Sequence, residues 1–125
     1  MKVGVLGSGD VAKVLAPGSL KHGVLSFFTN LNESLMENLQ AEFHGARFVK
    51  ASNSVGNARM ANPQFEGGKP TMFICGDDDG AKKTATEILD QFVWETADMG
   101  KAEAARAIEP LCMLSPPPQS IDSCF

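Results

Sequence analysis

The chain has 125 residues, a net charge of −4 at neutral pH, and 43% hydrophobic and 21% charged side chains. This length fits one domain, and the composition is that of an ordinary globular chain. The acidic balance and the lack of a basic cluster argue against nucleic acid and anionic membranes as partners. No apolar run approaches the length of a membrane span, and the chain begins directly with an expected strand. We therefore expect a cytoplasmic protein without a signal peptide.

The first predicted element is a short buried strand over residues 3–6, which leads through a glycine-rich turn into a helix. The turn has the spacing G-x-G-x-x-A. Gly7 permits the tight turn, Gly9 lets a pyrophosphate approach the backbone, and Ala12 lets the helix pack closely on the strand. Free N–H groups at the helix start would face the anion. A glycine-rich turn that binds nothing is the alternative.

The next segment predicts a helix. Residues 24–28 are apolar and suit either a short strand or the approach to this helix. Asn30 and Glu33 have the spacing of a capping box, and apolar residues every four positions predict a helical stripe through about Phe43. Glu33 is also the only acid near the place, about 20 residues after the glycines, where a dinucleotide site contacts the ribose. We favour its capping role, and no nearby basic residue selects NADP.

A weakly alternating strand is expected over residues 47–52, and it delivers Asn53 and Ser54 to its carboxyl end. Open α/β sheets place ligand contacts at this end of their strands. Asn and Gly also favour turns that bind nothing, so the sequence leaves the two interpretations of Asn53 and Ser54 open.

The second half alternates strand and helix. Residues 71–75 predict a buried strand and residues 94–99 a second one, with a helix between them and a last helix over 101–114, interrupted near Pro110. The apolar face of the middle helix comprises Ala81, Ala85, Ile88, Leu89 and Phe92. The alternation predicts a truncated α/β sandwich of three layers with a mostly parallel sheet of about four strands. Residues 1–114 form the expected domain, and the proline-rich residues 115–125 a disordered tail.

Few other residues suggest chemistry. Asp77–Asp79 lack metal-ligand spacing and precede a helix, so we expect them to cap it and we predict no metal site. His22 and His44 stand singly in expected loops. The three cysteines have no CxxC spacing, which predicts free thiols, with Cys75 and Cys112 in the core.

Six segments together resemble the NADPH-binding domain of the NADP oxidoreductases grouped with coenzyme-deazaflavin-dependent reductases. They are KVGVLGSGDVAK (2–13), GVLSFFTNLNESL (23–35), FVKASNSVGN (48–57), PTMFICG (70–76), ETADMG (95–100) and ARAIEPL (105–111). The resemblance implies a Rossmann-like domain that binds NADP(H), with NAD kept open, and exchanges a hydride with a deazaflavin-like or other small partner. It places Gly7, Ser8, Gly9, Asp10 and Val11 at the phosphates. It also places Asn53 and Ser54 near the nicotinamide. The cofactor would carry the reaction, so no catalytic side chain is expected.

The chain departs from this family in three places. Ser52 stands where the family usually has a large apolar residue. Between His22 and Val24 the family has further strands and helices, including the strand whose end holds the 2′-phosphate. The segment from Ser115 also differs. We therefore expect an internally deleted relative with impaired cofactor binding. The alternative is an inactive α/β fragment whose exposed sheet edge mediates self-association or partner binding.

Overall fold

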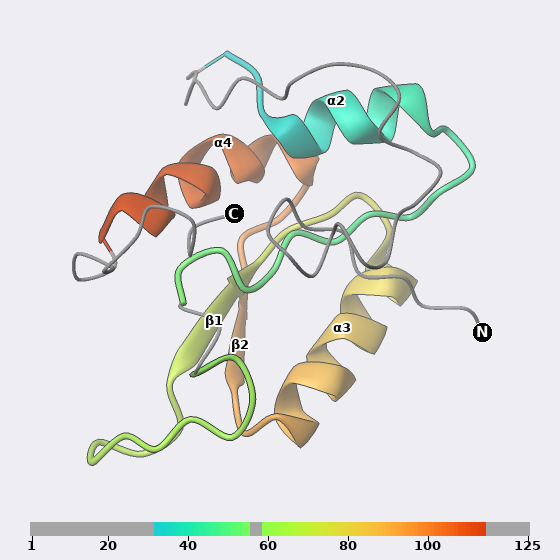
Figure 1. Ribbon diagram of the computed structural model, residues 1–125. Helices are drawn as coiled ribbons and strands as arrows, with labels where there is room; N and C mark the ends of the chain where they lie inside the picture. Colours follow the sequence, from blue (N-terminus) through green and yellow to red (C-terminus); the bar gives the residue numbers. More distant parts are fainter. Residues whose placement is uncertain (1–31, 56–58, 115–125) are drawn as a thin grey trace, which may run out of the picture.

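The structure is a computed structural model that describes residues 32–55 and 59–114 (Figure 1). The expected elements at residues 3–6 and 24–28, the glycine turn, Asn30 and the tail at 115–125 lie outside the described residues. The elements are α2 (Leu35–Glu42), β1 (Thr71–Ile74), α3 (Asp79–Gln91), β2 (Glu95–Asp98), the 3-10 helix η2 (Ala102–Ala104), α4 (Ala105–Ile108) and the 3-10 helix η3 (Glu109–Leu114).

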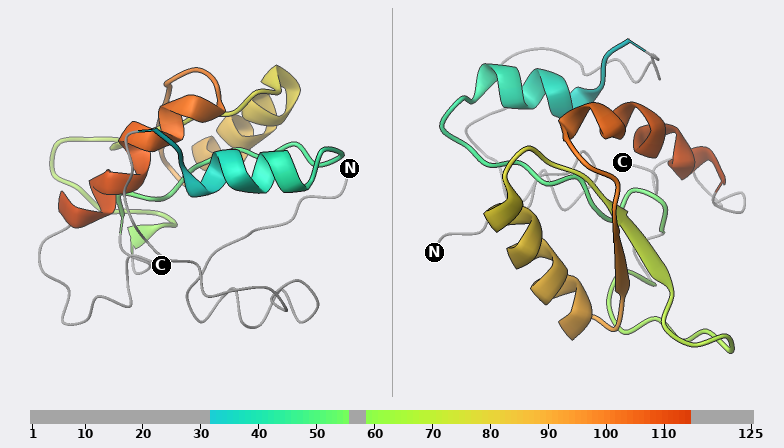
Figure 2. Two further views of the ribbon diagram at one scale, coloured as in Figure 1. Left: turned by 90° about the horizontal axis from the view of Figure 1, so that it is seen from above. Right: turned by 180° about the vertical axis from the view of Figure 1, so that it is seen from behind.

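The two strands and the helix between them form a parallel β-α-β unit. β1 pairs with β2 in parallel, with Thr71 opposite Glu95 and Ile74 opposite Asp98. Helix α3 runs back alongside the strands, whereas α2 and α4 lie next to each other near the carboxyl ends of the strands (Figures 1 and 2). This arrangement confirms the predicted α/β class with a parallel sheet.

Two buried clusters hold these layers together. Met72, Ile74, Leu89 and Trp94 join β1 to α3. Met36, Cys75, Ala102, Ala105 and Ile108 join α2 and α4 to the end of β1. Burial alternates along β1, because successive side chains of a strand point to opposite faces. The strand therefore contributes Met72 and Ile74 to the first cluster and leaves Phe73 36% exposed.

The predicted start of helix α2 is wrong. The helix begins at Leu35 with Ser34 as its N-cap, so Glu33 lies before the helix. The Ser34 hydroxyl accepts a hydrogen bond from the Glu37 N–H at 3.2 Å and donates one to the Glu37 carboxylate at 2.8 Å. Ser34 and Glu37 have the same i, i+3 spacing as Asn30 and Glu33, the pair that the sequence predicts as the cap.

The apolar stripe of α2 also differs from the prediction, since Met36 is the buried residue of the helix and Phe43 is 48% exposed.

Residues 47–52 are not a regular strand. They contact the sheet through one antiparallel bridge, in which the Lys50 and Cys75 backbones exchange hydrogen bonds of 2.9 and 3.3 Å. Ser52 has a φ of +58°, and its N–H points at the Met72 sulfur at 3.2 Å. This left-handed residue ends the extended segment, because side chains rarely adopt such a φ within a strand. In the described part of the chain the sheet therefore has two strands, where the sequence predicts about four for the whole chain.

The second half follows the prediction more closely. Both strands form where expected, and α3 begins directly after Asp78. The Asp78 carboxylate accepts a hydrogen bond from the Ala81 N–H at 2.7 Å, and Asp79 lies in the first turn. This confirms the capping role predicted for the acidic run. The last helix is divided, and its 3-10 segment η3 begins at Glu109, next to Pro110.

Candidate functional site

The carboxyl ends of β1 and β2 are the expected ligand edge of this fold. There the extended segment of residues 46–50 crosses the end of β1 so closely that Gly76 has no room for a side chain. A Cβ at this position would lie 2.7 Å from the Phe48 carbonyl oxygen. The Gly76 N–H donates to the Gly100 carbonyl at 3.0 Å and joins the two strand ends. The backbone itself therefore shapes this edge.

Asn53, predicted to contact a ligand, is fixed by the C-terminal helices. Its side-chain nitrogen donates to the carbonyl oxygens of Ile108 and Glu109, each at 2.8 Å. Because carbonyls only accept hydrogen bonds, this contact also fixes which end of the amide faces the helices. Both contacts use the amide nitrogen, so the Asn53 Oδ1 atom takes no part in them. Ser54 follows as a half-buried residue.

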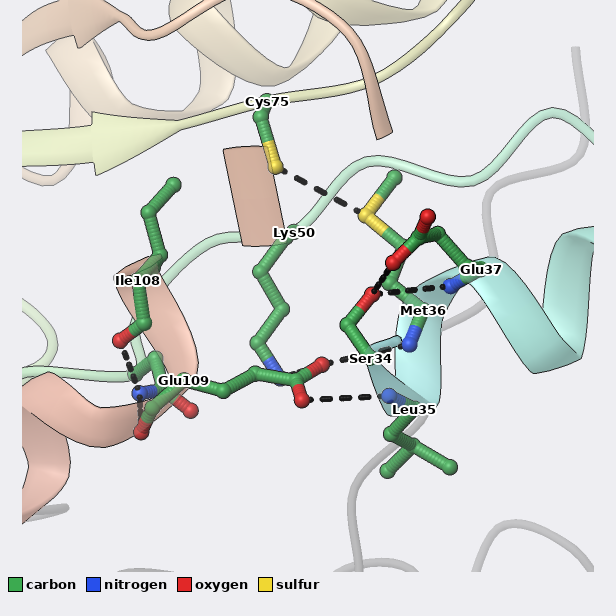
Figure 3. A network of polar contacts seen from close by, with 9 residues as sticks. Ser34, Leu35, Met36, Glu37, Lys50, Cys75, Ile108 and Glu109 are labelled. Atoms are coloured by element: carbon green, nitrogen blue, oxygen red, sulfur yellow. Dashed lines mark hydrogen bonds and ion pairs between the residues drawn. The ribbon is translucent and has the colours of Figure 1, made fainter. Parts of the chain in front are cut away.

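Glu109 connects three parts of the site (Figure 3). One carboxylate oxygen accepts from the Leu35 N–H at 3.1 Å, and the other from the Met36 N–H at 3.2 Å. The Lys50 ammonium lies 3.4 Å from the same carboxylate, with both side chains at most 20% exposed. Glu109 thus satisfies backbone donors that the first turn of a helix leaves without partners. No spacing in the sequence announces this contact, because Glu109 is 73 positions away from Met36.

A second ion pair joins α2 to α4. Arg106 donates from Nε to one Glu37 oxygen at 2.8 Å and from Nη2 to the other. This two-point geometry is the strong form of an arginine–carboxylate contact. The hydrogen bonds that Arg106 donates lower the pKa of Glu37 below its ordinary value and raise the pKa of Arg106.

Lys82 neutralises the acids beside the strand ends. Its ammonium lies 2.8 Å from Asp98 and 3.2 Å from Asp79. The hydrogen bond that Lys82 donates to Asp98 lowers the pKa of Asp98 and raises the pKa of Lys82. Asp77 accepts from the Ala102 N–H at 3.0 Å. The acids are therefore used in caps and ion pairs, and residues 32–55 and 59–114 contain no cluster of potential metal ligands.

Cys75 is a core residue, as predicted. It is fully buried, and its thiol lies 3.7 Å from the Met36 sulfur. Burial raises the pKa of the Cys75 thiol to about 11, so the thiol stays protonated near neutral pH and is a poor nucleophile. His44 is exposed in a turn, also as predicted. His22 lies outside the described part of the chain, and the side chain of Cys112 is not described.

The structure describes only one of the two parts of the predicted cofactor site. Asn53 and Ser54 are placed, whereas the phosphate residues Gly7, Ser8, Gly9, Asp10 and Val11 lie outside the described residues. An open concavity lined by Gln64, Phe65 and Glu66 belongs to the loop before β1. In the same loop Asn62 hydrogen-bonds the Phe92 carbonyl at 3.0 Å, near the amino ends of the strands. Ligands of open α/β sheets bind at the opposite end.

The described fold defines a small α/β protein with a parallel β-α-β unit and a polar network at its strand ends. It is similar to the 1.70 Å crystal structure of an Arthrobacter sp. FB24 protein provisionally assigned as an F420-dependent NADP reductase. The TM-score is 0.65 and the sequence identity 29%, over 76% of this chain and 44% of that protein. This chain therefore spans less than half of its structural relative.

No family model and no curated protein matches the sequence. Among the described helices, none is long and apolar enough to cross a membrane.

Proposed function

We propose that this chain is an NADP(H)-binding oxidoreductase related to the F420-dependent NADP reductases. It would exchange a hydride between the nicotinamide and a deazaflavin-like or other small partner, with NAD as the alternative cofactor and the cytoplasm as its compartment. The observation that carries this proposal is the structural similarity at 29% identity over 76% of the chain. The glycine-rich turn at residues 7–11, with the spacing of a dinucleotide site, supports it independently.

The residues proposed to hold the cofactor are of two kinds. Backbone N–H groups of residues 7–11 would bind the diphosphate. Asn53 and Ser54 would face the nicotinamide side, and the geometry of Asn53 fits this role because its fixed amide leaves Oδ1 as a hydrogen-bond acceptor. When bound, the nicotinamide supplies the hydride chemistry itself. The contribution of this chain is to position the cofactor, and we assign no side chain as acid, base or nucleophile.

We further infer that cofactor binding is weaker than in a full-length relative. The chain covers 44% of the similar structure, and the sequence passes directly from His22 to a segment that resembles a later part of the family domain. The strand whose end holds the 2′-phosphate in that family has no counterpart in this order of segments. Its loss would remove contacts on the adenosine side of the site.

A titration with NADPH tests the proposal. Binding would enhance the nicotinamide fluorescence and shift it to the blue, and Gly9→Val would abolish this change because its side chain blocks the approach of the pyrophosphate. Gly67→Ala is the matched control, since a Cβ at Gly67 meets no atom within 4 Å. No fluorescence change at millimolar NADPH would refute cofactor binding. Unaltered binding by Gly9→Val would refute the phosphate site.

The second candidate is an inactive module that binds another copy of itself or a partner protein. Exposed apolar side chains favour it, with Phe73 on β1 36% exposed and Met99 after β2 50% exposed. Size-exclusion chromatography with light scattering would then give a mass above 13.3 kDa. A monomer that does not bind a dye for exposed apolar surface would contradict this candidate.

A further inference from the structure

Glu109 takes part in two sets of contacts through different groups. Its carboxylate accepts the N–H groups of Leu35 and Met36 at the start of α2. Its main-chain carbonyl accepts one of the two hydrogen bonds that Asn53 donates. Glu109 therefore links the candidate ligand contact Asn53 to the first turn of α2, a helix that is distant in sequence.

The start of α2 depends on this arrangement. Ser34 caps the Glu37 N–H, so the local cap and Glu109 serve different donors. The N–H groups of Leu35 and Met36 have no carbonyl partner within the helix, because the first N–H groups of any helix lack one. The two carboxylate oxygens serve one donor each, so an amide in place of the carboxylate can satisfy only one of them.

We propose that Glu109 is a positioning residue that couples Asn53 to the first turn of α2. Asn53 holds the backbone of Ile108 and Glu109. This backbone, together with the Lys50 ammonium 3.4 Å from the carboxylate, directs the Glu109 carboxylate at the helix start. Loosening of the Asn53 contact would lengthen or break the bonds to Leu35 and Met36. A ligand that immobilises the Asn53 amide would strengthen them. The ligand-dependent half of this inference rests on the proposed function.

Amide hydrogen exchange of the full chain tests the coupling. Asn53→Asp has the same shape but cannot donate to the two carbonyls, and we expect it to accelerate exchange at Leu35 and Met36 by roughly five- to tenfold. The amides of Phe92 and Trp94, which bond to carbonyls of α3, are the internal reference. Thr86→Val is the matched control, since it removes a side-chain bond to the Lys82 carbonyl within α3.

A double-mutant comparison separates coupling from general loosening. In a Glu109→Gln background, Asn53→Asp should accelerate exchange at Leu35 and Met36 less than it does alone, because the directed carboxylate is already absent. Equal acceleration in both backgrounds would overturn the proposal. So would an equal acceleration at every amide, or none at Leu35 and Met36. If Asn53→Asp does not fold, Asn53→Ser is compared in the same two backgrounds with the same criteria.

NADPH is the probe for the ligand-dependent half. Saturating NADPH should slow exchange at Leu35 and Met36 in the natural chain and have less effect on them in Glu109→Gln. Binding that leaves both amides unchanged overturns this half alone. Failure of NADPH to bind refutes the proposed function, and the comparison of variants without ligand still decides whether Asn53 and Glu109 are coupled.

Discussion

Helices α3 and α2 begin in different ways, and the difference shows how this small fold is assembled. Helix α3 is capped by its own neighbour, since Asp78 accepts from Ala81 three residues later. Helix α2 has a local cap at Ser34 but also needs Glu109, which arrives from the other end of the described chain. The start of α3 therefore rests on a local contact, whereas the start of α2 also depends on a residue that only the complete fold brings close.

The largest effect should come from the core of the β1–α3–β2 unit. Leu89 is 5% exposed and packs with Met72, Ile74 and Trp94. Leu89→Ala should lower the free energy of unfolding by about 2–5 kcal/mol, because it removes buried contacts and leaves a cavity. Urea denaturation followed by circular dichroism measures the loss. Leu39→Ala in α2, at a half-buried position, should cost clearly less. Equal costs would contradict the distinction between the two regions.

Removal of the local cap of α3 should have the next largest effect. Asp78→Ala deletes the acceptor for the Ala81 N–H and should cost about 1 kcal/mol of unfolding free energy. Asp78→Asn keeps a capping oxygen and should restore most of that stability. Urea midpoints of the three proteins provide the comparison. An Asp78→Asn variant as unstable as Asp78→Ala would show that the carboxylate acts mainly through its charge.

The contact between α2 and α4 should make stability depend on pH. Arg106 lowers the pKa of Glu37 in the folded chain, so the folded state binds this proton less tightly than the unfolded state. The contribution is complete above the ordinary pKa of 4.5 and is lost as the pH falls through the lower folded-state pKa. Urea midpoints measured at pH 7 and at successively lower pH below 4.5 should therefore fall less in Glu37→Gln than in the natural chain. Identical pH profiles would rule out this contribution.

The smallest effect is expected at the surface of the α3 region. Lys69 and Asp90 form an ion pair of 2.7 Å, but their side chains are 51% and 69% exposed. Solvent and salt screen such pairs, so Lys69→Ala should change the unfolding free energy by less than about 0.5 kcal/mol. Thermal melts at low and high salt test this expectation. A larger loss that disappears at high salt would indicate that the pair belongs to a wider charge network.

The same two regions show how far the sequence could be interpreted. The strands at residues 71–74 and 95–98, and the helix between them, follow from apolar runs, acids at a helix start and short connections. These are local signals, and the α/β class follows from them. The sequence predicts the start of α2 too early, because Asn30 and Glu33 have the same capping spacing as Ser34 and Glu37. Spacing alone cannot distinguish two such pairs four residues apart.

The candidate site was less predictable than the fold. The position of Asn53 after an expected strand indicates a ligand contact. The hydrogen bonds of Asn53 to Ile108 and Glu109 join residues more than 50 positions apart, and so does the contact of Glu109 with α2. No local pattern encodes such pairs. The sequence also does not predict the left-handed Ser52, since serine carries no conformational signal of the kind that glycine does.

Gly76 also limits how this part of the chain can change in sequence. The main chain at Phe48 covers the residue that follows β1 at a distance that excludes even a methyl group. Any side chain at Gly76 would therefore have to push the crossing segment away from the end of the strand.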